Sequence, residues 1–143
     1  MEKIQMKTVL FDANVILDIH LARKGSYNAS MAAVAAAKRH GLKTYLSSVS
    51  ISIIHYIIEK ETNRTNAIKI LEKIRMLFDI APVDAKTVDM AIVSDFKDFE
   101  DALQYYSAIG VKADCIITGN KKDYKHSAIP VLAPEEFQLY LNR

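Results

Sequence analysis

Val9-Leu10-Phe11-Asp12-Ala13-Asn14 is the stretch that decides the fold, because an apolar run ends there in an acidic residue. A second apolar run, residues 114–118, is followed in the same way by Gly119-Asn120-Lys121-Lys122-Asp123. Short apolar runs of this kind are typical of buried strands, and parallel sheets bind ligands beyond the carboxyl ends of their strands. We therefore expect Asp12 and Asp123 to lie at one edge of a sheet.

The rest of the chain alternates short apolar runs with longer amphipathic ones. The expected strands are residues 8–11, 43–47, 78–81, 114–118 and 130–132. The expected helices are residues 14–22, 26–40, 48–61, 63–77, 84–94, 98–109 and 134–141. Residues 48–61 are ambiguous, because their many β-branched side chains also suit a strand. Strands separated by helices predict an α/β fold with a mostly parallel sheet covered by helices on both faces.

Length and composition fit one ordinary globular domain spanning residues 1–143. The net charge of +2 is too small to argue for nucleic acid by itself. The single cysteine, Cys115, cannot form an internal disulfide and fits a reducing compartment. No stretch approaches the ~20 apolar residues of a membrane helix, and the amino terminus lacks the apolar core of a signal peptide. We therefore expect a cytoplasmic protein without membrane contact.

A third acidic group has four carboxylates within seven residues: Asp95, Asp98, Glu100 and Asp101. Asp98 and Asp101 share one face of their expected helix. Clustered carboxylates repel one another unless a cation lies between them, and hard divalent cations prefer oxygen ligands. Each acid also has a plainer interpretation: a helix cap for Asp12, a helix-dipole partner for Asp98, a lysine-paired surface acid for Asp123. Their coincidence at the ligand-binding edge favours a metal site.

A Mg²⁺ or Mn²⁺ ion held by such carboxylates can bridge a phosphate and activate a bound water. Lysines beside Asp123 could hold a polyanionic backbone, although a lysine run is as often a solvated face. These lysines are Lys121, Lys122 and Lys125. Asn14 and Asn120 could orient carboxylates or waters. The histidines lack zinc-type spacing, and no glycine-rich phosphate loop is present.

Together, four stretches of this chain resemble PIN-domain nucleases. They are Phe11-Asp12-Ala13-Asn14-Val15-Ile16-Leu17-Asp18, Asp98-Phe99-Glu100-Asp101-Ala102-Leu103-Gln104, Ile117-Thr118-Gly119-Asn120-Lys121-Lys122-Asp123-Tyr124 and Ile129-Pro130-Val131-Leu132-Ala133-Pro134-Glu135-Glu136-Phe137. PIN domains are three-layer, Rossmann-like α/β/α folds. Many cleave RNA with magnesium or manganese, and many bacterial members are toxins paired with antitoxins. The resemblance implies that Asp12, Asp101 and Asp123 are the catalytic metal-site acids, with Asn120 and Asp98 beside them.

One departure from the family pattern concerns an acid that usually stands early in the helix after the second strand. The best register places Ile53 there, and Glu59 lies about 240° further around the helix, too far to substitute easily. The first hypothesis is therefore a metal-dependent ribonuclease of reduced activity, the toxin of a toxin–antitoxin pair. The second is an impaired PIN-like domain that binds RNA or a protein without cleavage, and the third is a Rossmann-like regulatory module. Candidate partners are RNA, an antitoxin and, in a homodimer, a second copy of the chain.

Overall fold

Five parallel strands form the central sheet of the computed structural model, which describes residues 5–142. Their bounds are β1 Thr8–Phe11, β2 Lys43–Ser47, β3 Asp79–Ala81, β4 Cys115–Ile117 and β5 Val131–Leu132. The spatial order is β3-β2-β1-β4-β5, and each neighbouring pair runs parallel. The prediction of a mostly parallel sheet is therefore confirmed.

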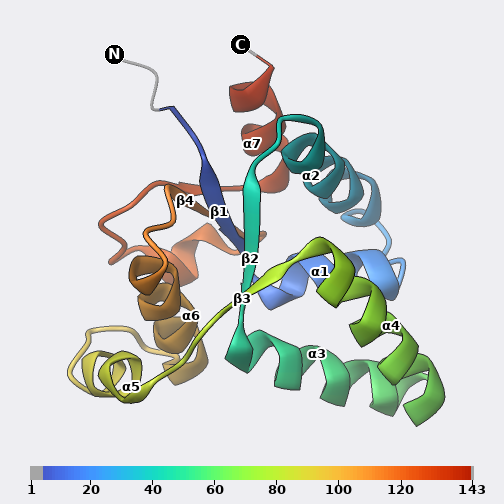
Figure 1. Cartoon of the computed structure of the whole chain (residues 1–143), viewed down its shortest axis with the longest axis horizontal. Coiled ribbons are helices and arrows are strands. Elements are labelled where there is room, and N and C mark those ends of the chain that lie inside the picture. Colours follow the sequence, from blue (N-terminus) through green and yellow to red (C-terminus); the bar gives the residue numbers. More distant parts are fainter. Residues whose placement is uncertain (1–4, 143) are drawn as a thin grey trace.

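Helices cover both faces of this sheet (Figure 1). One face carries α1 (Ala13–His20), α2 (Tyr27–Arg39), α3 (Ser48–Glu61), α4 (Arg64–Leu77) and α7 (Pro134–Leu141). The other face carries α6 (Phe99–Gly110), with α5 (Ala85–Ile92) packed beside it. Val9 and Phe11 point into the larger core cluster, while Leu10 points into the cluster under α6, because successive strand residues face opposite sides. The α/β/α arrangement of layers is thus as expected.

Local hydrogen bonds explain where the helices begin and end. The ambiguous segment is the helix α3: Ser47 caps it by accepting a hydrogen bond from the amide of Val49. Asp84 caps α5 as expected. Helix α1 ends at His20, two residues earlier than expected, and Ala22 beyond it has a positive φ of 48° that a continuing helix does not allow. Most other boundaries differ from expectation by one or two residues.

The strand order reverses between β1 and β4, which are neighbours in space but lie far apart in the chain. At their carboxyl ends the amide of Asp12 donates to the carbonyl of Ile117, at 2.9 Å. Ligands of doubly wound α/β sheets bind at such a switch point, beyond the carboxyl ends of the strands. The fold therefore brings Asp12 next to the segment that follows β4.

In residues 5–142, no helix combines the length and the apolar character needed to cross a membrane. The expectation about a signal peptide concerns the amino terminus, of which residues 1–4 lie outside the described part of the chain.

Candidate active site: an acidic cleft at the carboxyl edge of the sheet

Asp12 is buried at the end of β1, with only 2 % of its surface exposed. It caps α1 by accepting a hydrogen bond from the amide of Asn14, and its other oxygen accepts one from the Thr118 hydroxyl at 2.7 Å. Burial raises the pKa of Asp12, whereas the hydrogen bonds from Thr118, Asn14 and Gln104 lower it. The plain interpretation, a helix cap, is therefore correct for Asp12.

Gln104 connects three elements around Asp12. It is buried on α6, one turn after Asp101. Its side-chain oxygen accepts hydrogen bonds from the amide of Ala13 at 3.3 Å and from the hydroxyl of Ser50 at 3.1 Å. Its side chain also hydrogen-bonds Asp12 and helps to keep that carboxylate ionised. These contacts fix the orientation of Asp12 relative to α3 and α6.

Asp101 lies half-buried in the first turn of α6. Burial, followed by repulsion from Asp98, Asp12, Asp123 and Glu100, raises its pKa to about 7. The carboxylates of Asp12, Asp101 and Asp123 therefore lie within electrostatic reach of one another, as the sequence predicted. In residues 5–142, none of the three forms a salt bridge.

Asp98 and Asp123 occupy more exposed positions. Asp98 caps α6 by accepting a hydrogen bond from the amide of Asp101 at 3.0 Å, so its plain interpretation as a helix-terminus acid is also correct. Asp123 lies in the short 3₁₀ helix η1 (Lys121–Tyr124) that follows β4. Both line a cleft of about 340 Å³ together with Asp101.

The two asparagines singled out in the sequence are exposed, and the contacts they make near Asp12 are through the backbone. Asn14 donates its backbone amide to a carboxylate oxygen of Asp12. Asn120 donates its backbone amide to the Thr118 hydroxyl oxygen at 3.0 Å, and Thr118 in turn donates to Asp12. A role for either side chain stays a prediction.

Basic residues border the acidic cleft. Lys122 and Lys125 line it, as do His126 of the same basic stretch and Lys97, which the sequence did not single out. Lys121 instead forms a salt bridge of 2.9 Å with Glu136 at the start of α7. Two of the three predicted lysines therefore stand beside the carboxylates.

Tyr124 follows Asp123 in η1 and is buried, with 1 % of its surface exposed. Its ring packs in the core cluster under α6, edge-on to Phe96 at 6.2 Å between centroids. Burial, and then the charges of Asp12, Asp101 and Asp123, raise the pKa of its hydroxyl well above the usual value. Although Asp12 is near, the two do not meet hydrogen-bond geometry, and the hydroxyl has no partner among the described residues.

Ile53 is half-buried and packs against the larger core cluster. The α3 residue that reaches the site is Ser50, one turn earlier, through its hydrogen bond to Gln104. Ile53 and Ser50 share a helix face, so the proposal that Ile53 fills a lost acidic position stays a prediction.

The chemistry of these donors fits a hard divalent cation, since carboxylate oxygens predominate and their charges are uncompensated. In the described part of the chain, no three Asp, Glu, His or Cys side chains are already grouped tightly enough to hold a metal ion. The acids thus form an open arrangement, in which the Asp123 side chain is exposed.

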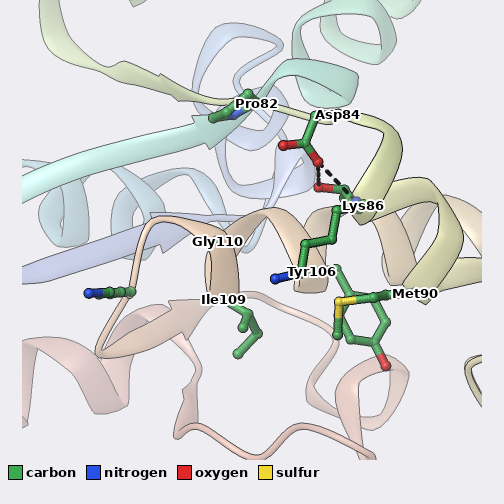
Figure 2. A pocket seen from close by; sticks show the side chains of 9 residues that line it. Pro82, Asp84, Lys86, Met90, Tyr106, Ile109 and Gly110 are labelled. Atoms are coloured by element: carbon green, nitrogen blue, oxygen red, sulfur yellow. Dashed lines mark hydrogen bonds between the residues drawn. The ribbon is translucent and has the colours of Figure 1, made fainter.

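A second cavity, of about 400 Å³, lies between α5 and α6 (Figure 2). Lys86 and Met90 of α5 face Tyr106 and Ile109 of α6 across it. Asp84 at its border caps α5, and its carboxylate accepts hydrogen bonds from the Thr87 amide and hydroxyl. None of the predicted site acids lines this cavity, so the acidic cleft remains the candidate active site.

A sequence model of the PIN domain matches residues 8–122. The chain belongs to the PIN-domain family. As a PIN domain it is 30 % identical over 135 residues to ribonuclease VapC1 of Aquifex aeolicus (strain VF5), with 90 % of this chain and 92 % of that protein covered. The family predicted from the four sequence stretches is thus confirmed.

Solved structures share the fold of this PIN domain at low sequence identity. A toxin–antitoxin complex from Klebsiella pneumoniae has a TM-score of 0.67 and 19 % identity, covering 90 % of this chain and 98 % of that one. VapC20 of Mycobacterium tuberculosis, described as a sarcin-ricin loop cleaving toxin, has a TM-score of 0.60 and 10 % identity, covering 76 % and 86 %. These similarities confirm the predicted three-layer fold.

Proposed function

We propose that this PIN domain is a cytoplasmic, Mg²⁺- or Mn²⁺-dependent ribonuclease, acting as one domain over residues 1–143. The proposal rests on Asp12, fixed at the switch point, and on Asp101 beside it, whose pKa is raised to about 7 by burial and then by the charges of the neighbouring acids. The likeness to a protein named ribonuclease VapC1 supports RNA as the substrate.

Asp12, Asp101 and Asp123 would hold the metal ion, with Asp98 adding negative charge beside Asp101. When bound, the ion supplies an activated water and charge neutralisation at the scissile phosphate. Thr118 and Gln104 keep Asp12 in one orientation beside Asp101. The side chains of Asn14 and Asn120 would orient the carboxylates or waters around this group.

Lys122 and Lys125 would bind the RNA backbone on either side of the acids. Both line the cleft, and neither forms a salt bridge within residues 5–142. Lys121 would contribute less, because Glu136 already holds its amine. Backbone binding by lysines releases counterions, so the affinity should fall as salt rises.

We also propose that the protein is the toxin of a toxin–antitoxin pair, as the similar Klebsiella complex suggests. An apolar groove of about 340 Å³ runs between α1, α2 and α4, with Ile19, Met31 and Leu77 among its lining residues. Lys38 and Lys73 border it with positive charge. These features suit an antitoxin segment that is apolar on one face and acidic at its sides. A homodimer is a further prediction, which light scattering of the free protein tests.

The second candidate is a PIN domain that binds RNA without cutting it, because the position where the family usually has an acid holds Ile53. Incubation of total bacterial RNA with the wild type and with Asp12→Asn, in Mn²⁺ and in chelator, separates the two. We expect cleavage by the wild type in Mn²⁺ and none in chelator or by the variant. Salt-sensitive RNA binding without cleavage would favour the second candidate, and the absence of both would favour a regulatory module.

A further inference from the structure

The hydroxyl of Tyr124 stands apart from the other buried polar groups of the chain. Within residues 5–142, it is the buried side-chain polar atom that lacks a hydrogen-bond partner. Buried hydroxyls are nearly always paired, and leaving one unpaired costs stability. An unpaired hydroxyl in a native core is therefore explained most simply by a partner that binds there.

The position of this hydroxyl identifies the place where that partner would sit. Tyr124 ends η1, directly after Asp123, and its ring is held in the core by Phe96. The hydroxyl at the far end of the ring is acted on by Asp12, Asp101 and Asp123, with Asp12 the strongest of the three. It therefore lies near the three site acids, two of which, Asp101 and Asp123, line the cleft.

The site carboxylates do not by themselves fill the hydrogen-bonding capacity of the Tyr124 hydroxyl. Asp12 already accepts hydrogen bonds from the Asn14 amide and the Thr118 hydroxyl. The Tyr124 hydroxyl lies close enough to Asp12 to interact with it, but the two do not meet hydrogen-bond geometry. A carboxylate oxygen can only accept, whereas a phenol oxygen also offers lone pairs as an acceptor. A group that occupies the cleft and donates a hydrogen bond would use this remaining capacity.

Tyr105 shows that the unpaired state is not general for tyrosines of this core. It belongs to the same cluster as Tyr124 and is also buried. Its hydroxyl accepts a hydrogen bond from the amide of Ala128 at 2.9 Å. The two residues thus form a matched pair, one with a protein partner and one without.

We propose that Tyr124 is a positioning residue, whose hydroxyl oxygen accepts a hydrogen bond from a water molecule in the hydration shell of a divalent cation in the acidic cleft. Mg²⁺ keeps several of its waters when proteins bind it, and such waters are strong donors because the cation polarises them. The hydroxyl would hold one water in a fixed place beside Asp12. This inference rests on the proposed function, which assigns the cation to this cleft.

The proposal predicts opposite effects of Tyr124→Phe in the absence and presence of the cation. In chelator, the variant loses an unpaired buried hydroxyl and should melt at the same temperature as the wild type or higher. In Mn²⁺, it lacks the acceptor for the water, and we expect the dissociation constant for Mn²⁺ to rise about tenfold.

Isothermal titration with MnCl₂ and melting curves in chelator test this with three proteins: wild type, Tyr124→Phe and Tyr105→Phe. The control Tyr105→Phe should melt at a lower temperature, because the amide of Ala128 loses its acceptor, and should bind Mn²⁺ as the wild type does. Two results would overturn the proposed role of Tyr124 without affecting the proposed metal site. One is an Mn²⁺ affinity of Tyr124→Phe equal to that of the wild type. The other is a melting temperature of Tyr124→Phe in chelator that falls as far as that of Tyr105→Phe. A wild type that binds no Mn²⁺ would overturn this role together with the proposed metal site.

Discussion

Replacing Asp101 by Asn should stabilise the cation-free protein at high pH. The folded state raises the pKa of Asp101 from its usual value of about 3.9 to about 7. A pKa rise of about three units corresponds to about 4 kcal/mol, and solvent screening of this half-buried group reduces that to about 1–2 kcal/mol. We therefore expect Asp101→Asn in chelator at pH 8 to raise the melting temperature by roughly 3–8 °C.

The pH dependence of this gain follows from the direction of the pKa change. The folded protein keeps the Asp101 proton up to about pH 7, whereas the unfolded chain releases it near about pH 4. Stability is therefore lost as pH rises between these values, and the variant escapes that loss. In melting curves from pH 4 to pH 8, the rise in melting temperature of Asp101→Asn over the wild type should be near zero at pH 4 and should reach its full size above pH 7.

Two comparisons make this prediction specific. Asp89→Asn removes an exposed carboxylate of α5 and should change the melting temperature little at any pH. In Mn²⁺ the wild type should gain stability and Asp101→Asn should gain much less, since the cation relieves the repulsion only where the carboxylate is present. Destabilisation of Asp101→Asn in chelator at pH 8 would refute the inference that uncompensated charge accumulates here.

Three further outcomes follow from the same geometry. Ile53→Asp should raise Mn²⁺ affinity and RNA cleavage; a loss of stability in metal and chelator alike would show that Ile53 is only a core residue. Replacing Lys122 and Lys125 by Ala should weaken RNA binding and reduce the slope of log affinity against log salt by about 1.4. Lys121→Ala should change RNA affinity less, and an equal loss of affinity would contradict RNA binding at the cleft. Burial raises the pKa of Cys115 to about 12, so a thiol reagent at pH 8 should label it only after unfolding, and fast labelling of the folded protein would contradict its burial.

The alternation of apolar and amphipathic runs was enough to predict the parallel sheet, its helical layers and the edge that carries Asp12. The boundaries of helices were less predictable, because caps decide them locally. Asp98 shows this: it was assigned to the helix, but it lies just before α6 as its cap. Segment 48–61 needed tertiary information, since only packing distinguishes a β-branched helix from a strand.

The groups that orient the site could not be found from sequence spacing. Gln104 contacts Ala13 across 91 positions and Ser50 across 54, so its role appears only when α6 and α3 meet at the sheet edge. The available signal was a glutamine one turn after Asp101, on the same face of the expected helix. The pairing of Lys121 with Glu136 likewise depends on where α7 returns to the sheet edge, and no local pattern predicts it.

The most direct test of the proposed metal site is a crystal of the wild-type protein soaked in MnCl₂, with anomalous diffraction measured for manganese. We expect one strong anomalous peak in the acidic cleft, coordinated by Asp12 and by Asp101 or Asp123, and absent in crystals of Asp12→Asn. A well-diffracting crystal without a manganese peak at Asp12, or with its peak away from these carboxylates, would rule out the proposed metal site.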